Sequence, residues 1–197
     1  MDYNERTSVE VIDMVERLAW AAQDPLLQAY HDHEWGVPVH DDRALFELLS
    51  LEGFQAGLSW LIVLQKRAAI KQAFYDFELT AVAQMPPAKI DALAQDPQLI
   101  RNRLKLQAVV VNAQAIQRVQ QAWGSFDAYL WHWVDGKPLV NRPQSQAEIP
   151  TQTPLSQTIA KDMKKRGFKF VGPVIIYSYL QGAGLVDDHL AGWRRLE

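Results

Sequence analysis

The chain has 197 residues, 48% of them hydrophobic and 22% charged, a composition typical of one soluble globular domain and unlike that of a disordered chain. Its net charge of −3 argues against a surface coated in basic charge for nucleic acid, and the lack of cysteine excludes disulfides and thiolate metal ligands. No apolar run approaches the roughly 18 residues that span a bilayer, and the acidic first residues do not form an export signal, so we expect a cytoplasmic protein without membrane contact.

Helical spacing of apolar residues dominates the first half of the chain. Asp41 and Asp42 can cap a helix whose leucines fall on one face. The same spacing continues through residues 54–77. A proline pair then opens a short helix over residues 86–93, because proline suits the first helical turn. This half of the chain is therefore predicted to be helical.

A long helix is predicted over residues 101–123, followed by an irregular stretch at 136–150. Thr153 and Pro154 then begin another helix. The apolar stripe of the long helix consists of Leu104, Ala108, Val111, Ala115 and Val119. No alternation of period two persists long enough to support a sheet. The sequence predicts a mainly α fold, with two lobes meeting at a groove.

Residues 155–184 indicate a helix, a glycine turn and a second helix. Gly167 can adopt the left-handed conformation that ends the first helix, and Gly172 precedes the proline that opens the second. The free N–H groups of that second helix favour an anion such as a DNA phosphate, although an ordinary helix corner has the same signature. Basic residues gather here and in a second group mid-chain: Lys161, Lys164, Lys165, Arg166 and Lys169, then Arg101, Arg103 and Lys105. Such local patches are typical of phosphate binding and also of solvated helix faces.

One carboxylate, Glu52, stands in the otherwise apolar stretch LEGFQAGLSW at residues 51–60. Charged residues are almost never fully buried unless they are paired. Glu52 therefore either forms a salt bridge beneath the surface or contacts a ligand. Gly53, Gly57 and Trp60 follow it closely in the sequence.

Five strings carry a resemblance to a known family: QDPLLQAYHDHEWGVP (23–38), LEGFQAGLSW (51–60), IRNRLKLQAVVVNAQA (100–115), EIPTQT (148–153) and KKRGFKFVGPVIIYSYLQGAGLVDDH (164–189). In this order they resemble the bacterial 3-methyladenine DNA glycosylase I family of the helix–hairpin–helix superfamily. The resemblance implies one helical glycosylase domain over residues 17–197, with residues 1–16 as an N-terminal extension.

The resemblance also implies an activity and a set of site residues. The family hydrolyses the bond between 3-methyladenine and its sugar in alkylated double-stranded DNA and releases the free base. Residues matching Tyr30 and Glu52 contact the base there, and tryptophans matching Trp20 and Trp60 line its pocket. The phosphate-gripping hairpin corresponds to Lys165, Arg166, Gly167, Lys169 and Gly172. We expect a monomeric, monofunctional enzyme of base excision repair.

The chemistry of the damaged base agrees with a recognition role for Glu52. Methylation at N3 leaves adenine positively charged and weakens its glycosidic bond, so no strong general acid is needed. Glu52 would accept hydrogen bonds from the amino edge of the base, while aromatic faces stack on the cation. The nucleotide must first be flipped out of the duplex, which costs a few kcal/mol.

The sequence departs from the family pattern at a zinc site. Well-known members bind zinc through two cysteines and two histidines; His31 and His189 match the histidines, but Leu18 and Trp193 occupy the cysteine positions. Two imidazoles do not make a closed tetrahedral site. We therefore expect no zinc and no other cofactor, with the two histidines hydrogen-bonded in the core and the termini closed by apolar packing.

Asp187, in the string LVDDHL, matches the place of a catalytic aspartate found in the wider superfamily but not generally used by this family. It is a candidate for stabilising positive charge on the sugar. Alternatively, Asp187 or Asp188 only caps a helix.

Two other functions remain open from the sequence. A non-catalytic binder of DNA or of methylated bases would keep the hairpin and the pocket. An unrelated helical interaction protein would leave the basic cluster merely solvated.

Overall fold

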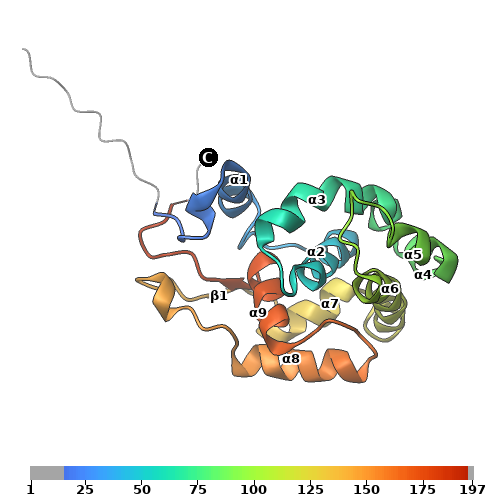
Figure 1. Ribbon diagram of the computed structural model, residues 1–197. Coiled ribbons are helices and arrows are strands. Elements are labelled where there is room, and N and C mark those ends of the chain that lie inside the picture. Colours follow the sequence, from blue (N-terminus) through green and yellow to red (C-terminus); the bar gives the residue numbers. More distant parts are fainter. Residues whose placement is uncertain (1–15, 195–197) are drawn as a thin grey trace, which may run out of the picture.

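The computed structural model describes residues 16–194 and consists mainly of helices, which are joined by turns and by some longer irregular segments (Figure 1). The longer helices are α1 (Pro25–His33), α2 (Asp42–Gln55), α3 (Trp60–Ala73), α4 (Leu79–Ala83), α5 (Pro87–Leu93), α6 (Arg103–Trp123), α7 (Phe126–Trp131), α8 (Pro154–Lys165) and α9 (Pro173–Gly182). Single turns of 3-10 helix are η1 (Ala21–Gln23), η2 (Tyr75–Phe77), η3 (His132–Val134) and η4 (Gln146–Glu148). The prediction of a mainly α fold is confirmed. Residues 1–15, most of the expected N-terminal extension, lie outside the described residues.

Side-chain caps begin two helices where the sequence predicts them. The Asp41 carboxylate accepts a hydrogen bond from the Ala44 N–H at 2.8 Å and starts α2. Thr153 and Ser156 each accept from the other's backbone N–H, at 3.2 and 2.9 Å, and start α8. Each such cap is worth about 1 kcal/mol, so these residues fix where the helices begin.

The continuous helical spacing predicted over residues 54–77 is wrong, because a turn separates two helices there. α2 ends at Gln55, and Gly57 adopts a φ of +77°, a conformation that favours glycine. Ser59 then caps α3 through the Ile62 N–H. This turn places Trp60 at the first position of α3, opposite the end of α2.

α2 passes through the middle of the described structure and packs against α3, α6, α7 and α9 (Figure 1). Its residues from Leu45 to Phe54 are all buried, including two carboxylates. Glu47 lies 2.7 Å from Arg67 and 3.2 Å from Lys71. Among the described residues, Glu52 forms no ion pair and its Oε2 atom has no hydrogen bond, unlike the paired Glu47 on the same helix.

The stripe predicted for α6 is partly wrong. Leu104 is 71% exposed, whereas Leu106 and Val109 are buried in the main core. The first turn of α6 directs Lys105 inwards instead of Leu104, because the Lys105 ammonium donates hydrogen bonds to the end of α2. Lys105 is thus buried and is not part of a surface phosphate-binding patch.

Two further features lie beside the main core. A smaller hydrophobic cluster connects α1 with the last described residues; it consists of Leu18, Leu27, Tyr30, Trp35, Leu64 and Leu190. The strands β1 (Leu139–Val140) and β2 (Val186–Asp187) pair in parallel and tie the irregular stretch to the segment after α9. The sequence did not predict this pair, since two-residue strands are too short to show an alternating pattern.

In the part of the chain that the structure describes, no helix is long and apolar enough to cross a membrane.

Candidate active site

A cavity of about 560 Å³ lies between the small cluster and the main core. α1, the end of α2, the start of α3, α9 and residues 146–151 contribute its walls. The aromatic and carboxylate residues expected to bind a base, Trp20, Tyr30, Glu52 and Trp60, all line it. Its volume and its mainly apolar walls are typical of a small-molecule site.

Glu52 lines this cavity without a salt-bridge partner among residues 16–194. The side chain is buried, and its Oε2 atom has no hydrogen bond within that range. Burial raises the pKa of Glu52 to about 8, because a carboxylate loses its hydration there. The salt bridge weighed from the sequence is not formed within the described residues, since the nearby cations on α3 pair with Glu47. An uncompensated carboxylate in a cavity indicates a site for a cation or a hydrogen-bond donor.

Aromatic rings face each other around this carboxylate. Tyr30 and Trp60 lie with ring centroids 5.2 Å apart at 57°, and Trp20 lies 6.4 Å from Tyr30. The Tyr30 hydroxyl and the Trp60 indole N–H are both buried and have no hydrogen bond to any residue that the structure describes. Burial, and then the charge of Glu52, raise the pKa of Tyr30 well above its ordinary value, so the phenol stays a neutral donor. The residues that line the cavity therefore combine aromatic rings with two donors and one acceptor that have no hydrogen bond within the described residues.

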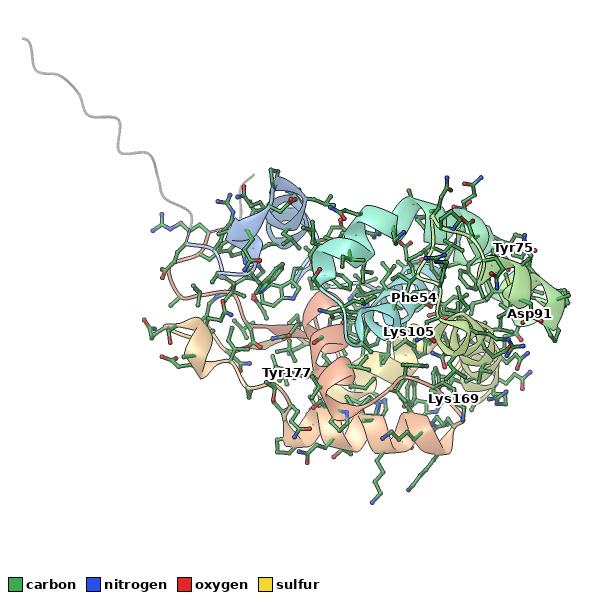
Figure 2. All side chains as sticks on the ribbon, in the orientation of Figure 1. Phe54, Tyr75, Asp91, Lys105, Lys169 and Tyr177 are labelled. Atoms are coloured by element: carbon green, nitrogen blue, oxygen red, sulfur yellow. The ribbon has the colours of Figure 1, made fainter. Side chains whose placement is uncertain are left out.

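Lys105 supports the end of α2, a role that the sequence analysis missed. Its Nζ donates to the carbonyl oxygen of Phe54 at 2.8 Å and also to that of Ala56 (Figure 2). The last carbonyls of a helix have no partners within the helix, so this ammonium satisfies them and also fixes the turn that leads to Trp60. Burial lowers the pKa of Lys105.

Polar residues on α9 form another part of the wall that the sequence analysis missed. Ser178 and Gln181 both line the cavity, three positions apart on one helix face. Two polar side chains at this spacing in an otherwise apolar helix were the available signal. Thr151 and Gln146, from the irregular stretch, complete this side.

The predicted hairpin is formed by α8, Gly167 at a φ of +92°, and Gly172 at the N-cap of α9. Asn112 of α6 holds the turn through two hydrogen bonds: its amide donates to the Lys169 carbonyl at 3.1 Å and accepts from the Lys169 N–H at 2.8 Å. The side chains of Lys165 and Lys169 are exposed. Arg166 instead pairs with Asp162 at 2.6 Å. The hairpin therefore presents Lys165 and Lys169 to solvent beside a turn that Asn112 holds.

Asp187 lies on β2, outside the set of residues that line the cavity. It forms an ion pair with Arg142 at 2.8 Å and accepts hydrogen bonds from the His189 ring, at 2.7 Å, and from the His189 N–H. Burial raises the pKa of Asp187, but these bonds outweigh burial and the pKa is lowered overall. No described helix begins at this segment, so neither Asp187 nor Asp188 is a helix cap here.

The residues at the family's zinc positions do not fit a zinc ion. The rings of His31 and His189 have centroids 4.9 Å apart, and each Nδ1 is hydrogen-bonded to an aspartate. Trp193 stacks on His189 with centroids 3.6 Å apart, and Leu18 is buried in the small cluster. Within residues 16–194, no group of three or more His, Cys, Asp or Glu residues has the arrangement of a metal site. The remaining donors give fewer than the four ligands of a structural site.

Comparison with known proteins finds a family model and relatives that match most of the chain. Residues 20–195 match the methyladenine glycosylase family model. The chain is 46% identical over 178 residues to DNA-3-methyladenine glycosylase 1 of Escherichia coli (strain K12), covering 90% of this chain and 95% of that protein. It is 42% identical over 177 residues to DNA-3-methyladenine glycosylase of Haemophilus influenzae, covering 90% and 96%.

Solved structures show the same similarity. A crystal structure of 3-methyladenine DNA glycosylase I superposes with a TM-score of 0.87 at 47% identity, covering 90% of this chain and 98% of that one. A structure that concerns 3-methyladenine recognition by the Staphylococcus aureus enzyme has a TM-score of 0.86 at 44% identity, covering 89% and 94%. This chain belongs to the methyladenine glycosylase family.

Proposed function

We propose that this chain excises 3-methyladenine from alkylated double-stranded DNA and that it binds the flipped-out base in the cavity beside Glu52. The observation that carries the proposal is the buried Glu52 carboxyl, which has an unbonded oxygen and no cation beside it within the described residues. Its relatives from E. coli and H. influenzae are named DNA-3-methyladenine glycosylases, and similarity over 90% of the chain supports the same substrate.

A cationic base supplies what the Glu52 carboxyl lacks. Its positive charge favours the ionised carboxylate, and one N–H of its amino group donates to Glu52. The rings of Tyr30 and Trp60 stack on the base, and such contacts are worth about 1–3 kcal/mol per base. A normal adenine is neutral and gains less from the same groups, so the cavity selects the damaged base.

The reaction needs little acid catalysis. When the bond between N9 and the sugar C1′ breaks, the bonding electrons neutralise the charge of the methylated base, which leaves as a neutral molecule. Water then bonds to C1′ and loses a proton. The protein contributes by holding the base in a site with little water, where its charge interactions are strong.

The hairpin positions the DNA for this step. Lys165 and Lys169 are exposed beside the turn between Gly167 and Gly172, where backbone N–H groups favour a phosphate. Arg166 contributes through its pair with Asp162, which orders the end of α8. Asp187 stays a candidate for charge stabilisation at the sugar, as its lowered pKa keeps it ionised. The monomeric state, the cytoplasmic location and the lack of a cofactor also stay predictions.

A test must separate excision from binding alone. Methylated duplex DNA is incubated with the native protein, and released free bases are measured beside DNA binding at several salt concentrations. Release of 3-methyladenine supports the enzyme, whereas salt-sensitive binding without release supports the non-catalytic binder. Asp187→Asn, assayed in parallel, releases base at the native rate if Asp187 only orders the Arg142–His189 segment.

A further inference from the structure

A second buried carboxylate lies close to the cavity wall, and the function proposed above does not use it. Asp188 is 1% exposed and accepts three hydrogen bonds: from the Asn141 amide at 2.7 Å, the Tyr177 hydroxyl at 2.6 Å and the Gln181 amide at 2.7 Å. All three donors are neutral, and Asp188 forms no ion pair within the described residues. Three such donors keep a buried carboxylate satisfied without a cation.

One of these donors reaches the cavity. Gln181 lines it, next to Ser178 on the same face of α9. The NH₂ group of the Gln181 amide donates to Asp188 Oδ2, so this end of the amide faces Asp188. The carbonyl oxygen, Oε1, is then the atom left for an occupant of the cavity. The backbone of Gln181 is also held, since its carbonyl oxygen accepts from the Gly36 N–H at 3.0 Å.

We propose that Asp188 is a positioning residue that fixes the Gln181 amide with its carbonyl oxygen toward the cavity, which makes Gln181 a specificity-determining acceptor for a base with an amino group at C6. The inference rests on the proposed function and deepens it. A fixed acceptor binds the amino group at C6 of methylated adenine and repels the carbonyl oxygen at C6 of methylated guanine. Discrimination of this kind is large because the wrong base leaves a buried polar group unpaired.

The chain offers a matched control for this role. Tyr177 lies on the same helix as Gln181 and donates to the same Oδ2 atom of Asp188, but it is not among the residues that line the cavity (Figure 2). Tyr177→Phe removes one neutral donor from Asp188, as loss of the Gln181 bond does. Asp188→Asn places an NH₂ group where the carboxylate accepted, so the Gln181 amide can turn its own NH₂ toward the cavity.

The experiment measures release of 3-methyladenine and of 3-methylguanine from methylated duplex DNA, with excess protein. Asp188→Asn and Gln181→Met are expected to lower the ratio of the two rates by about tenfold, the effect of one well-placed hydrogen bond. Tyr177→Phe is expected to lower the melting temperature but to keep the native ratio. The double variant Asp188→Asn/Gln181→Met should show no greater loss than Gln181→Met alone, because Asp188 acts through Gln181.

Unchanged ratios of the two release rates in Asp188→Asn and Gln181→Met would overturn the inference. An equal fall of this ratio in Tyr177→Phe would also overturn it, because it would indicate a purely structural role for Asp188. If Asp188→Asn does not fold, Gln181→Met decides the matter, since it keeps the length of the side chain. If the native protein releases no base at all, the proposed function fails. Binding of the two free bases, followed by tryptophan fluorescence, then tests the inference separately.

Discussion

Lys105 Nζ lies 2.8 Å from the carbonyl oxygen of Phe54 and so connects the first turn of α6 to the end of the helix that carries Glu52. The same ammonium bonds to Ala56 at the start of the turn that leads to Trp60. A single buried cation thus sets the relative position of the recognition carboxylate and of an aromatic wall. This geometry explains why a lysine is directed into the core.

Replacing Lys105 with methionine should loosen this connection. Lys105→Met leaves two helix-end carbonyls without a donor, and we expect a loss of about 1–3 kcal/mol in the free energy of unfolding together with slower base release. Lys66→Met is the matched control, because Lys66 also donates to two backbone carbonyls but lies at the surface, away from the cavity. Urea unfolding and single-turnover release measure both effects; equal behaviour of the two variants would contradict the assigned role.

The raised pKa of Glu52 predicts how stability depends on pH. Between the ordinary value of 4.5 and about 8, the folded protein holds a proton on Glu52 that the unfolded chain has released. Stability contributed by this group is therefore full below pH 4.5 and is lost as the pH rises to about 8. In Glu52→Gln this loss should be absent, so the two unfolding free energies diverge across that window. Parallel curves would show that Glu52 titrates normally.

The unbonded hydroxyl of Tyr30 predicts a variant that gains stability while it loses function. Tyr30→Phe removes a buried hydroxyl that has no hydrogen bond. We expect a melting temperature equal to or above the native one, because the desolvated hydroxyl at position 30 is gone. We also expect base release to be slower by about threefold to tenfold. A variant that is destabilised, yet fully active, would place the hydroxyl in a structural hydrogen bond instead.

The packing of Trp193 on His189 predicts that chelators do not change the melting temperature of the protein. Trp193 stacks on His189, and the Trp193 side chain is buried. Trp193→Ala should cost about 3 kcal/mol in stability, the usual effect of removing a buried tryptophan. The native protein should melt at the same temperature with EDTA and with added zinc. A rise in melting temperature with zinc would refute the expected lack of a metal site.

Much of the fold was predictable because its signals are local. Asp41 and Thr153 cap helices through their own side chains, and Gly167 ends α8 in the conformation expected of glycine. The turn at Gly57 was missed because the apolar spacing continues on both sides of it. The inward direction of Lys105 was also missed, since it depends on the carbonyl groups of a helix about fifty positions earlier.

The site was predictable in a different way. Trp20, Tyr30, Glu52 and Trp60 were assigned to it from the family resemblance, and they line one cavity. No local pattern brings these four residues together, because the packing of η1, α1, α2 and α3 does so. Gln181 and Asp188 were not assigned to the site, because their hydrogen bond forms across the turn after α9 and the apolar spacing of the helix does not show it.

The most direct test of the account compares Glu52→Gln with Glu47→Gln. Both carboxylates are buried on α2, but Glu47 pairs with Arg67 and Lys71 outside the cavity, whereas Glu52 lines it. We predict that Glu52→Gln folds and binds DNA but releases 3-methyladenine at least about tenfold more slowly, while Glu47→Gln loses stability and keeps the native rate per folded molecule. Native release by a folded Glu52→Gln protein would show that the carboxylate does not recognise the base.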